Sequence, residues 1–219
     1  MMHHNWGDQG TNHRADPDWI LDPQTLSVRG GLARTGFGET SEALFLNSGF
    51  TYATAEQAES SFAEELDHYL YSRFHNPTVT MFENRLAALE GAARCLATSS
   101  GMSAMFMSIA CMVETGDRVV ASAAMFSSCH VVLTEILSKW GVKVELVKSD
   151  DHEGWKRALT QPTKAVFIET PSNPLLEITD IKFVSDLAQC IHIGGMTSNV
   201  YRHYCASMFA DITLDRRRI

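Results

Sequence analysis

The chain has 219 residues, of which 45% are hydrophobic and 20% are charged, as is ordinary for a globular protein. Its formal net charge of −8 argues against a nucleic-acid partner and against a basic surface that binds membranes. No uninterrupted apolar stretch is long enough to span a bilayer, and residues 1–19 lack the apolar core of a signal peptide. We therefore expect a cytoplasmic protein that does not enter the membrane.

The cysteines and histidines do not show the spacing of a metal site. The five cysteines are an odd number, and no pair of them is spaced as C-x-x-C. The nine histidines are scattered along the chain without a set of four ligands. We expect reduced cysteines, most of them buried, and no metal site.

The chain divides into four segments by pattern. We interpret residues 1–28 as a flexible leader and residues 29–70 as an N-terminal arm with a short amphipathic helix over 55–66. Residues 71–188 alternate helices with strands, and residues 189–219 form an atypical tail.

The alternating segment begins with a helix whose ends are marked locally. Asn76 is a good cap, Pro77 suits the first helical position, and Gly91 ends the helix. Next we predict a strand over 94–97 and then a helix over 102–113. That helix is apolar on nearly every side, so it must be buried.

The pattern continues with a strand over 118–121 and a helix over 127–140. The apolar stripe of that helix consists of Val132, Ile136 and Trp140, and Gly141 ends it.

Strands then follow over 142–147 and 165–168, and Asp180 caps a last helix in which Ile181, Val184 and Leu187 have core spacing. Such alternation predicts an α/β fold with a largely parallel sheet. We predict no regular strand beyond residue 190.

The first candidate site is a phosphate cradle at residues 98–104. A strand leads into the turn Ser99-Ser100-Gly101, and a buried helix opens at Met102. Free backbone N–H groups at a helix N-terminus bind phosphate, Gly101 permits close approach, and the serine hydroxyls add donors. The alternative is an ordinary turn between a strand and a helix.

Two further segments carry candidate binding residues. Tyr71 and Arg73 precede a helix and could hold a phosphate with a hydroxyl and a guanidinium, or Arg73 could be a surface arginine. Asn173 lies between Pro171 and Pro174 after a buried strand, at the sheet edge where α/β proteins bind ligands, or in a merely rigid turn.

Together these segments resemble the successive motifs of the Cys/Met-metabolism PLP-dependent enzymes. The family includes cystathionine γ-synthase, methionine γ-lyase and O-succinylhomoserine sulfhydrylase, and the resemblance is greatest to the last, over about residues 25–188. The matching motifs are Tyr-Ser-Arg at 71–73, Asn-Pro-Thr at 76–78, Ser-Gly-Met at 100–102 and Glu-Thr-Pro-Ser-Asn-Pro at 169–174. Val-Arg-Gly-Gly at 28–31 and Phe-Gly-Glu-Thr at 37–40 also resemble the sulfhydrylase members.

The resemblance implies a fold, a cofactor and an assembly. The implied fold is that of a PLP-dependent transferase (aspartate-aminotransferase-like, fold type I), present here as an incomplete large domain with an N-terminal arm. The implied cofactor is pyridoxal 5′-phosphate (PLP), and the implied assembly is a homodimer or tetramer. Backbone N–H groups of Gly101 and Met102, with Ser100 beside them, would hold the phosphate, while Tyr71 and Arg73 would reach it from the neighbouring subunit.

The resemblance also assigns residues that would contact the cofactor ring. Phe126 would stack on the pyridine, although most members of the family have a tyrosine there, and Asn173 would bond to the phenolic oxygen. The aspartate that pairs with the pyridine nitrogen is replaced by Ser198, followed by Asn199. The Schiff-base lysine is expected in a Ser-x-Thr-Lys motif beyond residue 219, so no catalytic lysine is assigned among Lys139, Lys143, Lys148, Lys156, Lys164 and Lys182.

Two functions of different class follow. The first is γ-replacement on O-succinylhomoserine or O-acetylhomoserine with sulfide or cysteine, as in methionine biosynthesis and transsulfuration. The second is a truncated, catalytically dead fragment or partner-binding pseudoenzyme, with a tail at 189–219 that is read in a shifted frame. A third interpretation, an unrelated nucleotide-binding domain, is disfavoured because neither a Walker motif nor a dinucleotide fingerprint occurs.

Overall fold

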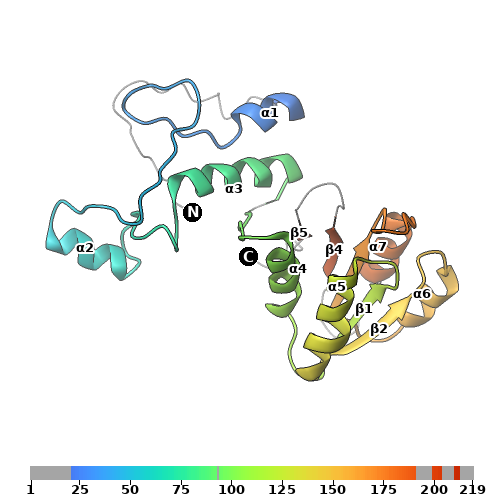
Figure 1. Cartoon of the computed structure of the whole chain (residues 1–219). Helices are drawn as coiled ribbons and strands as arrows, with labels where there is room; N and C mark the ends of the chain where they lie inside the picture. The colour runs from blue at the N-terminus through green and yellow to red at the C-terminus, as the bar shows by residue number, and fades with distance from the viewer. Residues whose placement is uncertain (1–20, 93, 191–198, 204–209, 213–219) are drawn as a thin grey trace. The chain divides into compact units, whose positions relative to one another are not determined.

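The structure, a computed structural model, describes residues 21–92, 94–190, 199–203 and 210–212. It divides the chain into two units, residues 1–97 and residues 98–219. The described part of the first unit consists of helices and connecting segments, whereas the second contains the β-sheet (Figure 1).

The N-terminal unit contains the helices α1 (Pro23–Arg29), α2 (Ala55–Phe62) and α3 (Pro77–Glu90). The predicted bounds of α3 are confirmed by its caps. The Asn76 side chain accepts the N–H of Thr78, and Gly91 ends the helix with a φ of 63°.

The helix predicted over 55–66 is present but shorter. The Thr54 hydroxyl caps α2 by accepting the N–H of Gln57 at 3.1 Å. The helix ends at Phe62, and two residues later Glu64 has a φ of 60°, which helical geometry does not allow. The prediction therefore extended the helix past its observed end.

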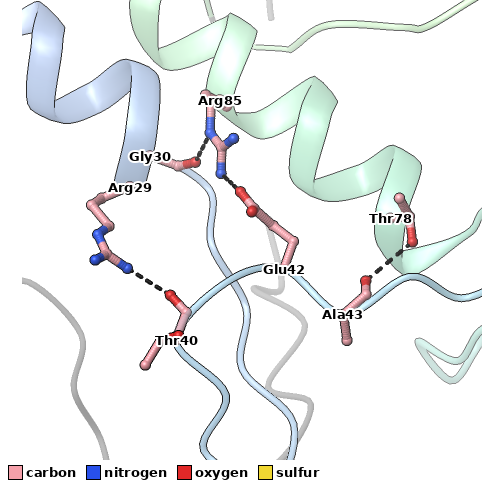
Figure 2. A network of polar contacts seen from close by, with 7 residues as sticks. All are labelled: Arg29, Gly30, Thr40, Glu42, Ala43, Thr78 and Arg85. Carbon is pink, nitrogen blue, oxygen red and sulfur yellow. Dashed lines mark hydrogen bonds and ion pairs between the residues drawn. The ribbon is translucent and has the colours of Figure 1, made fainter.

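Arg85 on α3 fastens the N-terminal arm to that helix. Its guanidinium donates to the Gly30 carbonyl at 2.8 Å and pairs with the Glu42 carboxylate (Figure 2). This donation holds the pKa of Glu42 below its ordinary value. Gly31, with a φ of 69°, lies so close to α3 that a Cβ there would meet the backbone N of Arg85 at 2.8 Å.

One further contact adds to this attachment, because the Thr78 hydroxyl of α3 donates to the Ala43 carbonyl at 3.4 Å (Figure 2). Within the arm, Arg29 donates to the Thr40 carbonyl at 2.8 Å. Side chains bonded to backbone carbonyls thus hold residues 29–43, and little apolar burial contributes.

The C-terminal unit is built on a five-stranded sheet with the order β2-β1-β3-β4-β5. The first four strands are parallel, and β5 is antiparallel to β4. The strands are β1 (Arg118–Ser122), β2 (Lys143–Val147), β3 (Ala165–Glu169), β4 (Asn199–His203) and β5 (Ala210–Ile212). The three strands predicted over 118–121, 142–147 and 165–168 are therefore confirmed.

Helices cover both faces of this sheet. They are α4 (Gly101–Ala110), α5 (Ser127–Val131), the π-helical segment η1 (Val132–Leu137), α6 (His152–Ala158) and α7 (Ile181–Cys190). On one face α4, α5 and η1 pack against Ala121 and Phe167, and on the other α6 and α7 pack against Val120 and Ile168. Neighbouring strand residues alternate between the two faces, which makes a helix–sheet–helix sandwich.

The predicted strand over 94–97 is wrong. These residues have no regular secondary structure, and the N–H of Ala97 donates to the Glu83 carboxylate at 2.7 Å. A strand forms when its backbone groups bond to those of a neighbouring strand. Here the acceptor of a backbone N–H is instead a side chain on α3.

Two helix predictions need correction in detail. The helix predicted over 102–113 spans Gly101–Ala110, and Met107 on it is exposed, so it is not buried on every side. In the helix predicted over 127–140, the buried stripe is Cys129, Leu133 and Leu137, whereas Trp140 is exposed. Of the predicted stripe, Val132 is buried in the core as expected, whereas Ile136 and Trp140 are exposed. The π-helical turn was not predicted.

The prediction of no strand after residue 190 is also wrong. Within the described residues, β4 pairs in parallel with β3, in the register Ala165↔Asn199 to Glu169↔His203. The sequence of β4 shows little alternation, so the strand forms because it pairs with the buried strand β3. Ser198 lies outside the described residues.

Candidate functional site

The first element of the candidate site is the N-terminus of α4. The Ser100 hydroxyl caps this helix by accepting the N–H of Ser103 at 3.1 Å, and the Thr98 hydroxyl donates to the Ser100 carbonyl at 2.8 Å. The N–H groups of Gly101 and Met102, in the first turn, have no intrahelical acceptor. They offer a pair of donors at the positive end of a helix.

The second element joins two loops at the carboxyl edge of the sheet. Phe126 follows β1 and immediately precedes α5, and Asn173 follows β3. Their backbone N–H groups donate to the two oxygens of one carboxylate, that of Glu169, at 2.8 and 2.6 Å. The two candidate ring contacts are therefore fixed to a common group.

A third contact connects these loops to α4. The sulfur atoms of Cys129 and Met102 lie 3.9 Å apart, which places the start of α4 beside α5 (Figure 1). Cys129 is three residues beyond Phe126. The structure thus brings Met102, Phe126 and Asn173 to one edge of the sheet, where open α/β sheets bind ligands.

The residues fit PLP by the chemistry of their donors. The α4 N-terminus supplies backbone N–H groups suited to a phosphate, and Phe126, with 38% of its surface exposed, supplies an aromatic face. The Asn173 side chain is exposed and carries an amide, which can donate to a phenolic oxygen. Phe126 brings no hydroxyl to this set.

Tyr71 and Arg73 belong to the other unit, so their contact with the phosphate stays a prediction. The Arg73 guanidinium lies 5.6 Å from the ring centre of Tyr71 and 4.5 Å from that of Phe74. All three side chains are exposed. Arg73 is thus stacked on two aromatic rings of its own chain.

Glu169 is the residue that the sequence interpretation missed. It was quoted within the motif at 169–174 but received no role, although it is 0% exposed. A usable signal was present, because Glu169 directly follows four apolar residues of a buried strand. A charged group at such a position needs partners.

Within the described part of the chain, no group of three or more His, Cys, Asp or Glu residues is arranged to hold a metal ion. Among the same residues, no helix is long and apolar enough to cross a membrane.

Comparison with known proteins identifies relatives of this chain. The family model for the Cys/Met metabolism PLP-dependent enzyme matches residues 24–207. An O-succinylhomoserine sulfhydrylase from Mycobacterium tuberculosis is 50% identical over 188 residues, which cover 86% of this chain and 46% of that protein. One from Pseudomonas aeruginosa is 39% identical over 181 residues, covering 83% of this chain and 44% of that protein.

A solved structure agrees with these matches. The cystathionine γ-synthase from Xanthomonas oryzae pv. oryzae, in complex with aminoacrylate and cysteine, has a TM-score of 0.72 and 28% identity. The match covers 83% of this chain and 44% of that one. The present chain spans about half the length of the curated relatives it matches.

Proposed function

Because this chain belongs to the Cys/Met-metabolism family of PLP-dependent enzymes, we propose that it works in γ-replacement on an acylated homoserine. The cofactor of the family is PLP, and the relatives are enzymes that act on small molecules. The proposed acyl donor is O-succinylhomoserine or O-acetylhomoserine, and the proposed nucleophile is sulfide or cysteine. The observation that carries the proposal is that Met102, Phe126 and Asn173 lie at one edge of the sheet, connected through Cys129 and through the Glu169 carboxylate.

Each residue has a proposed task. The N–H groups of Gly101 and Met102, supported by the Ser100 cap, bind the cofactor phosphate, and the helix dipole adds to this attraction. Phe126 stacks on the ring and excludes water from one side, and Asn173 orients the phenolic oxygen. When bound, PLP supplies the electron sink that allows bonds at the substrate's amino-acid carbons to break.

The remaining contact is proposed to come from a second copy of the chain. Tyr71 and Arg73 would reach the phosphate in a homodimer or tetramer, where Arg73 would exchange its stacking for an ionic bond. An exposed cation–π contact is worth about 0.5–1 kcal/mol. A hydrogen bond to a charged group is worth about 1.5–3 kcal/mol, so Arg73 should bind the phosphate in preference to the aromatic rings.

Turnover is the direct test of the proposal. A form of the protein that includes the expected Ser-x-Thr-Lys motif should be incubated with PLP, sulfide and either O-succinylhomoserine or O-acetylhomoserine, and then with cysteine in place of sulfide. Release of homocysteine or cystathionine is expected. Bound PLP without product from any of these pairs would contradict the proposal and favour a binding protein without turnover.

The shared site has a separate test. Arg73→Ala should weaken binding of pyridoxine 5′-phosphate roughly ten- to a hundredfold in a dimer and leave a monomer unchanged. Phe74→Ala is the matched control, because it removes a stacking partner of Arg73 and keeps the guanidinium. An equal loss for Arg73→Ala in monomer and dimer, with mass measured in parallel, would show that Arg73 acts within its own chain.

A further inference from the structure

We infer that Glu169 is a positioning residue that fixes both proposed ring contacts, Phe126 and Asn173. The inference rests on the proposed function, because it assumes that these two side chains meet the cofactor. Glu169 itself acts through the backbone of its neighbours.

The geometry gives Glu169 two partners from different loops. Its Oε2 accepts the N–H of Phe126, which lies 43 residues earlier, at 2.8 Å. Its Oε1 accepts the N–H of Asn173 at 2.6 Å. One rigid group therefore sets the distance between the loop after β1 and the loop after β3.

The position of Glu169 makes this group stiff. It is the last residue of β3, every residue of which is buried, and it continues the side of the strand that carries Ala165 and Phe167. A carboxylate that is fully removed from water is costly unless it is hydrogen-bonded. The two N–H groups meet that need, and the buried strand prevents the carboxylate from moving away.

At the same sheet edge, two other loops are joined by uncharged side chains. After β1, the Ser122 hydroxyl lies 3.1 Å from that of Ser149 and accepts the N–H of Ala124 at 3.3 Å. Neutral hydroxyls thus join the loops after β1 and β2. The carboxylate occurs where both joined loops carry a proposed cofactor contact, and its charged acceptors make stronger bonds than hydroxyls do.

The test is an isosteric substitution in the full chain. Glu169→Gln keeps one acceptor oxygen but turns an amide donor toward the second N–H, so one of the two bonds is lost. We expect the affinity for pyridoxine 5′-phosphate to fall about tenfold. Glu177→Gln is the matched control, because Glu177 lies in the same loop with an exposed side chain, and its affinity should not change.

Two readouts separate positioning from a purely structural role. Without ligand, the amide hydrogens of Phe126 and Asn173 should exchange faster in Glu169→Gln than in the wild type, because their acceptor is altered. With ligand, Glu169→Gln should change affinity less than twofold in a Phe126→Ala/Asn173→Ala background, because the side chains that it positions are absent.

The outcomes distinguish this inference from the proposed function. If the wild type does not bind pyridoxine 5′-phosphate, both fail. If the wild type binds and Asn173→Ala weakens binding, but Glu169→Gln has no effect, only the inference fails. It also fails if the loss is equal in both backgrounds, if the two amides exchange as before, or if Glu169→Gln does not fold.

Discussion

Each of the two units is stabilised internally, and the interactions that stabilise one differ from those that stabilise the other. Among the described side chains of the N-terminal unit, the buried apolar ones are Tyr69, Met81 and Ala87. Its arm is fastened mainly by side chains bonded to carbonyls (Figure 2). In the C-terminal unit, Val119 and Val120 of β1 and every residue of the neighbouring strand β3 are buried between two apolar layers.

This difference indicates that the C-terminal unit is the more stable of the two. Apolar burial gives the C-terminal unit a fixed sheet edge on which the candidate site is built. The N-terminal unit leaves large apolar side chains uncovered, among them Phe37 and Leu46, which are 98% and 93% exposed. We propose that a second copy of the chain covers part of this surface.

A matched pair of leucines gives the largest expected effect. Leu133→Ala, at a 0% exposed position, should lower the free energy of unfolding by about 2–5 kcal/mol. Leu46→Ala should change it by less than about 0.5 kcal/mol in a dilute monomer. Denaturant unfolding checks both values. A loss at Leu46 as large as that at Leu133 would mean that the N-terminal unit also depends on apolar packing.

A matched pair of glycines tests the close approach of the arm to α3. Gly31 and Gly38 both have a φ of 69°, but a Cβ would meet α3 only at Gly31. Ala at either position should cost about 1–2 kcal/mol for its conformation, and Gly31→Ala should lose about 1–3 kcal/mol more through overpacking. Equal losses in thermal unfolding would contradict the observed approach.

Two arginine substitutions compare the double attachment of the arm to α3 with a single bond inside the arm. Arg85→Ala removes the bonds to Gly30 and Glu42, and we expect arm stability to fall by about 1–2 kcal/mol. Arg29→Ala removes one exposed bond to Thr40 and should cost about 0.5 kcal/mol. Hydrogen exchange over residues 29–43 measures both. A larger loss of protection for Arg29→Ala than for Arg85→Ala would contradict the role given to Arg85.

The smallest expected effect is a pH dependence of the arm. Donation from Arg85 lowers the pKa of Glu42 below its ordinary value of 4.5, so the folded state favours the ionised carboxylate. Its contribution, less than about 0.5 kcal/mol, is complete above pH 4.5 and is lost as the pH falls through the lowered pKa. Glu42→Gln should remove this part of the pH dependence of exchange in the arm. An unchanged profile would exclude Glu42 as its source.

The sequence predicted those parts of the fold that depend on nearby residues. The caps of α3 at Asn76 and Gly91 were correct because each acts within a few residues of itself. Residues 94–97 were predicted wrongly because their partner is a side chain, Glu83, on another element. The strand β4 was missed because its pairing with β3 determines it.

The assignment of cofactor contacts in the candidate site stays a prediction. The sequence placed Met102, Phe126 and Asn173 in one site by resemblance, and the structure brings them to one sheet edge. It did not assign Glu169, because the role of that carboxylate depends on the N–H of Phe126, far away in the chain. Local patterns do not contain such long-range contacts.

Ligand-induced protection of amide hydrogens tests the central claim most directly, namely that the C-terminal unit carries the cofactor site. The chain should be compared with and without pyridoxine 5′-phosphate, at a concentration at which it is a monomer, with pyridoxine as the control without phosphate. We predict slower exchange at Gly101, Met102, Phe126 and Asn173, with pyridoxine leaving Gly101 and Met102 unprotected. Protection confined to residues 1–97, or equal protection of Gly101 and Met102 by both ligands, would contradict the account.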